Sequence, residues 1–120
     1  MLLVAVRDLL FASKIDAAAK RVGAAIVWAP RGTALSEVVR ERRPDALLVD
    51  LGEPRVFEEL RAVRAELPGV RVVGYTGHLQ ADLLDEARSL GLVEVLTRGQ
   101  LSASLDDVLM RAAAAAPPPA

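Results

Sequence analysis

The chain has 120 residues, the usual length of one domain, and 52% of them are hydrophobic while 26% are charged. This balance predicts a folded domain with one core and excludes a disordered or collagen-like chain. The 15 basic and 16 acidic residues leave a net charge of -1, so the basic excess typical of nucleic-acid binding is missing. The sequence has no cysteine and one histidine, which excludes disulfides and thiol chemistry and leaves few zinc-ligand combinations.

The two ends of the chain set its expected location and boundaries. The first apolar run, residues 2–6, stops at Arg7 and Asp8, far short of the roughly 20 residues that a membrane span needs. We therefore expect a cytoplasmic protein that binds neither membranes nor nucleic acid. Proline stops a helix, and residues 114–120 read Ala-Ala-Ala-Pro-Pro-Pro-Ala. The sequence thus predicts one domain over residues 1–113 and a flexible Ala/Pro tail over residues 114–120.

Five short apolar runs alternate with segments of helical period. Such runs predict strands covered by helices on both faces, and they span residues 2–6, 24–28, 46–49, 70–75 and 92–96. The segments between and after them each carry apolar residues three and four apart, as amphipathic helices do. Gly23 and Gly91 are expected to end the first and fourth helices. Ser104 and Asp107 are expected to open the last helix as a capping box.

A strand–helix unit repeated five times predicts an α/β fold, a (βα)5 flavodoxin-like three-layer sandwich around a parallel five-stranded sheet. Functional groups of such folds gather at the carboxyl ends of the strands. Right-handed crossovers leave few arrangements for the strands. With the resemblance described next, they predict the spatial order 2-1-3-4-5.

Three segments resemble response-regulator receiver domains of bacteria. Asp50-Leu51-Gly52-Glu53-Pro54 is similar to the D-L-x-x-P signature of the phospho-accepting aspartate, and Thr76 follows the fourth strand as a receiver threonine or serine does. Residues 91–99 resemble the receiver stretch Gly-Ala-x-x-Tyr-Leu-x-Lys-Pro. The resemblance covers about residues 2–111. It implies a receiver-like signalling module of two-component systems or phosphorelays.

The chain departs from the receiver pattern where the phosphotransfer chemistry resides. Val6 and Arg7 stand where receivers carry two adjacent acids that hold Mg²⁺, and Asp8 follows them. Because Mg²⁺ prefers several oxygen ligands, we expect weak Mg²⁺ binding at most and no other cofactor. Arg98 corresponds to the receiver lysine and Val95 to the switch aromatic. These changes indicate a degenerate receiver, a pseudo-receiver.

The candidate site residues are Arg7, Asp8, Asp50, Thr76 and Arg98. By resemblance, Asp50 is the candidate phospho-acceptor, supported by Thr76 and Arg98. The alternative is a structural Asp50 carboxylate that pairs with arginine, and we predict that Arg7 or Arg98 lies within ion-pair distance of it. Thr76 either binds a phosphoryl group or satisfies a neighbouring backbone group.

Two other polar residues are not expected to be catalytic. His78 has no placed partner, and Ser13 lies inside a helical pattern without the context of a nucleophile. The site therefore predicts no catalytic residue and no enzyme, although autophosphorylation of Asp50 stays open.

The sequence predicts a stand-alone regulatory module that acts by protein–protein contact, with a kinase or an output protein as partner. A functional receiver phosphorylated on Asp50 is one alternative. A binder of a small anion, held by Arg7, Arg98 and Thr76 in the strand-end crevice, is another. A homodimer is expected to form through residues 82–90, 92–98 and 104–111, where Arg88 and Arg111 lie among acids.

Overall fold

The computed structural model describes residues 1–77, 80–92 and 94–113. Its strands form one parallel sheet in the order β2-β1-β3-β4-β5, which confirms the predicted order. They are β1 (Leu2–Ala5), β2 (Ile26–Trp28), β3 (Ala46–Asp50), β4 (Arg71–Thr76) and β5 (Glu94–Thr97). His78 and the tail predicted over residues 114–120 lie outside the described residues.

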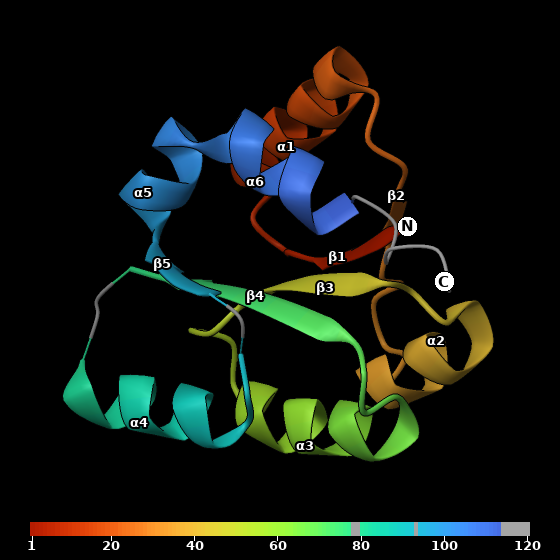
Figure 1. Cartoon of the computed structure of the whole chain (residues 1–120), viewed down its shortest axis with the longest axis vertical. Helices are drawn as coiled ribbons and strands as arrows, with labels where there is room; N and C mark the ends of the chain where they lie inside the picture. Colours follow the sequence, from red (N-terminus) through yellow and green to blue (C-terminus); the bar gives the residue numbers. More distant parts are fainter. Residues whose placement is uncertain (78–79, 93, 114–120) are drawn as a thin grey trace, which may run out of the picture.

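Helices cover both faces of the sheet, so the predicted three layers are present (Figure 1). One face carries α1 (Leu9–Val22), α5 (Arg98–Ala103) and α6 (Leu105–Ala113). The other carries α2 (Leu35–Arg42), α3 (Val56–Glu66) and α4 (Ala81–Ser89). Gly23 and Gly91 follow α1 and α4 with φ of 70° and 69°, the left-handed conformation that the sequence predicts there.

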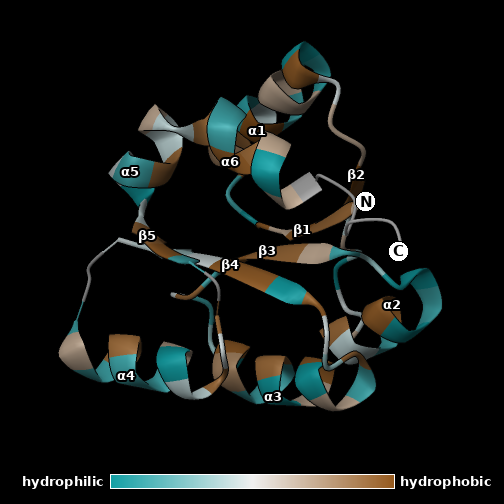
Figure 2. Ribbon diagram, in the orientation of Figure 1, coloured by the Kyte–Doolittle hydropathy of each residue, from teal (hydrophilic) through white to brown (hydrophobic). Residues whose placement is uncertain are grey.

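The core is divided by the sheet because successive strand residues point to opposite faces. In β3, Leu48 packs with α1 and α6, whereas Leu47 and Val49 pack with α2 and α3. The strands are accordingly mainly hydrophobic, with polar residues such as Arg71 of β4 near their ends, while the outward sides of the helices are hydrophilic (Figure 2). This double covering explains why the strand runs in the sequence are continuous rather than alternating.

The end of the chain differs from the expectation. Helix α5 was not predicted, and the capping box lies at its start, where Thr97 accepts from the Gln100 amide and the Gln100 side chain accepts from the Thr97 amide. The box predicted at Ser104 and Asp107 is wrong. The Ser104 hydroxyl donates instead to the Gln100 carbonyl at 2.7 Å, which joins α5 to the start of α6.

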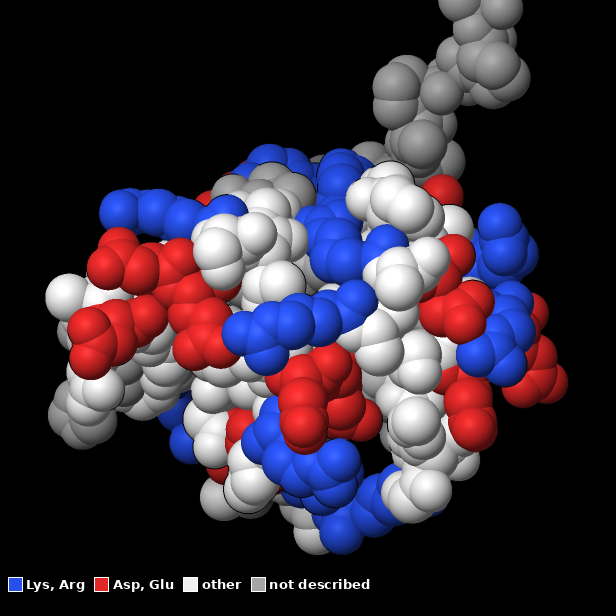
Figure 3. Space-filling model, turned by 90° about the horizontal axis from the view of Figure 1, so that it is seen from below, with Lys and Arg blue, Asp and Glu red and all other residues white. Residues whose placement is uncertain are grey.

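The face made by α2, α3 and α4 carries basic and acidic side chains next to one another (Figure 3). Arg40 pairs with Glu66 and Arg61 with Glu86, both at 2.7 Å. These ion pairs link α2 to α3 and α3 to α4. In the part of the chain that the structure describes, no helix combines the length and apolar character needed to cross a membrane.

Candidate functional site

The predicted site residues meet at one edge of the sheet. Asp8 lies just after β1, Asp50 and Thr76 end β3 and β4, and Arg98 follows β5. They are close because the carboxyl ends of parallel strands lie at the same edge. The structure therefore brings these residues to the same end of the sheet, and their contacts there decide what chemistry they can support.

Asp8 is committed to two structural contacts. Its Oδ1 accepts hydrogen bonds from the amides of Leu10 at 3.0 Å and Phe11 at 3.1 Å, which caps α1. Its Oδ2 forms an ion pair with Arg98. The Arg98 guanidinium also lies 5.1 Å from the centre of the Phe11 ring, within the range of a cation–π contact. Both carboxylate oxygens of Asp8 are thus occupied by the protein itself.

The predicted ion pair to Asp50 is wrong. Among the described residues, Arg98 pairs with Asp8, Arg7 lies 4.0 Å from Glu53, and neither pairs with Asp50. The half-buried Asp50 carboxylate accepts a hydrogen bond from the Gly52 amide at 2.8 Å. Asp50 has no arginine partner in the described part of the chain because Asp8 and Glu53 are the acids nearest to the two arginines. The turn after β3 already supplies a hydrogen-bond donor to one Asp50 oxygen.

The small-anion site predicted between Arg7 and Arg98 is also not assembled. Arg7 lines a pocket beside β2, α2 and α3, whereas Arg98 lines a hollow beside α1 with Asp8 and Phe11. Thr76 is buried at the end of β4, next to Thr97 of β5 in the sheet. The two guanidinium groups therefore lie in different hollows at the strand ends and do not form one anion site.

Tyr75 is a site residue that the sequence did not reveal. It lies beside Asp50 in the sheet, and its ring meets Phe11 edge to face at 5.1 Å between centroids. Burial raises the pKa of the Tyr75 phenol, and the nearby Asp50 carboxylate raises it further. The buried hydroxyl forms no hydrogen bond of normal geometry with the described residues. The sequence offered one indication of its place: Tyr75 directly precedes Thr76, which was predicted to lie at the site.

Replacing Asp8 by alanine is expected to lower the free energy of unfolding by about 1 to 2 kcal/mol, because the α1 cap is lost. Asp8→Asn keeps an oxygen for the cap and removes only the charge that pairs with Arg98. Because such half-exposed pairs contribute less than about 1 kcal/mol, the asparagine variant should be clearly more stable than the alanine variant. Urea denaturation of the two variants measures the difference, and equal losses would contradict the capping role.

Removing the Tyr75 hydroxyl is expected to stabilise the protein. Tyr75→Phe keeps the ring against Phe11 and removes a buried hydroxyl that lies near the Asp50 carboxylate but makes no hydrogen bond of normal geometry with the described residues, and a buried polar group without a good hydrogen bond costs about 1 to 3 kcal/mol. We expect an increase in the free energy of unfolding of about 1 kcal/mol. Thermal and urea unfolding measure it. A loss of stability would mean that the hydroxyl has a partner in solution.

Comparisons with known proteins identify the architecture. Neither a family model nor a curated protein sequence matches the chain. A response regulator of Burkholderia pseudomallei, solved with a phosphorylated aspartic acid, is similar with a TM-score of 0.74 and 18% identity, over 90% of this chain and 65% of that one. A response regulator of Thermotoga maritima has a TM-score of 0.76 and 18% identity, over 95% and 98% of the two chains.

A third similar structure is the signal receiver domain of the response regulator NarL from Mycobacterium tuberculosis. Its TM-score is 0.75 at 23% identity, and the match covers 93% of this chain and 94% of that domain. The chain thus spans the whole of some receiver structures and about two thirds of the Burkholderia protein. These likenesses show that the chain has the receiver fold.

Proposed function

We propose that the chain is a receiver-fold regulatory module of two-component signalling that acts in the cytoplasm by protein contact, without catalytic turnover. The observation that carries the proposal is the state of Asp8. This acid lies in the short turn between β1 and α1, yet its two oxygens cap α1 and bind Arg98. A carboxylate held in this way is a poor candidate to share a cation with Asp50.

The residues present do not fit Mg²⁺. This ion takes a tight octahedron of oxygen ligands, whereas the two residues that follow β1 are the apolar Val6 and the cationic Arg7. In the described part of the chain, no three acidic or histidine side chains form a group suited to a metal ion. We therefore propose that Mg²⁺ binds weakly at most and that transfer of a phosphoryl group to Asp50 is impaired.

The test is incubation with acetyl phosphate and Mg²⁺, followed by intact-mass measurement. We expect no added phosphoryl group on the native chain, and the same spectrum for Asp50→Asn, which removes the candidate acceptor. A phosphoryl adduct on the native chain that is absent from Asp50→Asn would overturn the proposal. It would instead support a working receiver that functions with a reduced metal requirement.

The proposed contact surface consists of α4, β5 and α6. The edge strand β5 lies between helices of the two faces (Figure 1), and Arg111 of α6 pairs with Glu94 of β5 at 3.5 Å and with Asp107 at 2.9 Å. Met110 of α6 is an exposed hydrophobic residue. Val95 packs against the core on the α2 and α3 side. Because the Val95 side chain is small and packed against the core, we propose that this surface is fixed rather than gated by phosphorylation.

Charge reversal tests the surface. Arg88→Glu should weaken self-association or partner binding, because the arginine lies on α4 and is bonded only loosely, at 3.8 Å, to Asp85. Lys20→Glu on α1 is the matched control: the two side chains are 77% and 78% exposed, and each pairs with an acid of its own helix. Sedimentation velocity with and without acetyl phosphate measures the effect. Equal behaviour of the two variants, or dependence on the phosphodonor, would contradict the proposed surface.

A further inference from the structure

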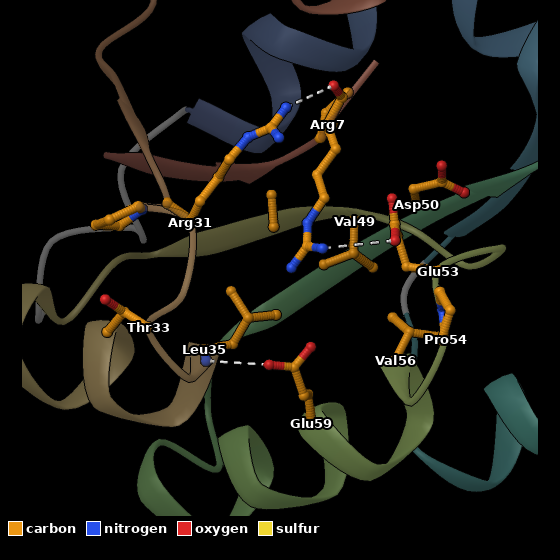
Figure 4. A pocket seen from close by; sticks show the side chains of 14 residues that line it. Arg7, Arg31, Thr33, Leu35, Val49, Asp50, Glu53, Pro54, Val56 and Glu59 are labelled. Atoms are coloured by element: carbon orange, nitrogen blue, oxygen red, sulfur yellow. Dashed lines mark hydrogen bonds and ion pairs between the residues drawn. The ribbon is translucent and has the colours of Figure 1, made fainter.

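A pocket of about 100 Å³ opens at the carboxyl ends of β1, β2 and β3 (Figure 4). It lies on the side of the sheet covered by α2 and α3, whose residues Leu35 and Val56 line it. In this sheet β1 is flanked by β2 on one side and β3 on the other, so the chain reverses its winding direction here. Crevices at such switch points are where open α/β sheets place ligands.

The pocket has an apolar floor and a charged rim. Its floor includes Leu35, Val49 and Val56, which are 6%, 1% and 4% exposed. The rim carries two arginines and three carboxylates, namely Arg7, Arg31, Asp50, Glu53 and Glu59. Figure 4 shows the Arg7 side chain reaching across the pocket between the loop after β2 and the start of α3. A ligand in this pocket would therefore contact apolar side chains at the floor and both positive and negative side chains at the rim.

Asp50 accepts a hydrogen bond of normal length from the Gly52 amide, but the other four charged groups at the rim are only loosely bonded to the protein. Arg7 lies 4.0 Å from Glu53, Arg31 donates to the Arg7 carbonyl at 3.4 Å, and Glu59 accepts from the Leu35 amide at 3.4 Å. Several ion pairs elsewhere on this chain are much closer, such as Arg40–Glu66 and Arg61–Glu86, both at 2.7 Å. Charge-assisted hydrogen bonds normally measure about 2.7 to 2.9 Å. The rim thus retains donors and acceptors for a ligand.

We propose that this pocket binds a small zwitterion of the α-amino-acid class with an aliphatic side chain. The two arginines recognise its carboxylate, the carboxylates of Glu53 and Glu59 recognise its ammonium group, and the apolar floor covers its side chain. The inference goes beyond the proposed function, because the α4–β5–α6 contact surface lies elsewhere. Either can fail without the other.

Size and charge exclude other ligand classes. Pockets for drug-sized ligands measure about 300 to 1,000 Å³, so a volume of about 100 Å³ is too small for a nucleotide. A phosphate dianion would meet Asp50, Glu53 and Glu59, whose charges repel it. A simple cation would in turn be repelled by Arg7 and Arg31. A ligand that carries both charges can place each of them next to rim residues of the opposite charge.

The experiment is a methyl NMR titration of the full chain, observing Val49 and Val56. The probes are L-valine, isovalerate, which has only the negative group, isobutylamine, which has only the positive group, and inorganic phosphate. L-Valine should shift the methyl signals saturably and bind at least about tenfold more tightly than the other three probes, as expected from losing one ionic contact. No saturable shift with L-valine, or equal affinity for isovalerate or phosphate, would overturn the inference.

Two variants assign the binding to the rim. Arg31→Gln and Glu59→Gln should each weaken L-valine binding by about tenfold or more. Glu66→Gln is the matched control, because it removes the same charge from the same helix but lies at the ion pair with Arg40, outside the pocket. Circular dichroism confirms that each variant is folded. Equal affinities of Glu59→Gln and Glu66→Gln would assign the shifts to another place and contradict the proposed site.

Discussion

Replacing Arg64 by alanine is expected to lower the free energy of unfolding by about 2 to 4 kcal/mol, since hydrogen bonds from a charged group each contribute about 1.5 to 3 kcal/mol. The side chain lies on α3 and donates to four carbonyls. Its Nε and Nη2 reach Leu90 and Gly91, both at 2.8 Å, and its Nη1 reaches Pro68 at 3.0 Å and also Val70. One guanidinium therefore joins the turn before β4 to the turn after α4.

The shape of the guanidinium should matter as much as its charge. Arg64→Lys keeps the charge but replaces a planar fork with a compact ammonium group, so it should recover less than half of the loss. Arg61→Ala is the matched control, because Arg61 lies about one turn earlier on α3 and, among the described residues, forms an ion pair with Glu86 alone, a pair worth about 1 kcal/mol at most. Urea denaturation measures all three variants. A loss for Arg64→Ala no larger than that for Arg61→Ala would contradict the bridging role.

Most of the fold follows from two periodicities in the sequence. Continuous apolar runs predict covered strands, and stripes at three and four residues predict helices; the structure has both in the predicted order. Helix α5 escaped this pattern because it is one short segment whose buried apolar residue is Leu101. Its start was nevertheless readable, since Thr97-Arg98-Gly99-Gln100 matches the spacing of a capping box.

The site was predictable in place but not in pairing. That Asp8, Asp50 and Arg98 share one edge follows from the parallel strands. Which acid an arginine binds does not follow, because its side chain is long and several carboxylates lie within reach. Asp8 is positioned as the α1 cap, and the same position brings it to Arg98. A local capping requirement thus decides a contact between residues 90 positions apart.

The sequence predicts a crevice at the strand ends that includes Arg7, but it does not predict that Arg31 and Glu59 line it. Its arginines follow β1 and β2, and its glutamates belong to the turn after β3 and to α3. These segments are far apart along the chain and meet only because β1 lies between β2 and β3. The long contacts between the charged groups at the rim could not be predicted either, because the spacing of residues in a sequence does not give the distances between their side-chain atoms.

Replacing Gly74 by alanine is expected to lower the free energy of unfolding by about 1 to 3 kcal/mol, the usual range for overpacking a core. Leu51, in the turn after β3, lies directly over this glycine of β4. A Cβ added at Gly74 would lie 2.7 Å from Leu51 Cγ and Cδ1 and 2.9 Å from Cδ2. Alanine otherwise suits a strand better than glycine by about 0.5 to 1 kcal/mol, so a loss of stability would report the clash alone.

A double-mutant cycle identifies Leu51 as the cause. Leu51→Ala alone should cost about 2 to 5 kcal/mol as a buried truncation, but it removes the atoms that the new Cβ would meet. Gly74→Ala should then be nearly neutral in the Leu51→Ala background, which gives a coupling energy of about 1 to 3 kcal/mol. Gly77→Ala is the control, because no atom lies within 4 Å of its added Cβ. Additive losses at Gly74 and Leu51, measured by urea denaturation, would show that the turn after β3 does not depend on the bare backbone of β4.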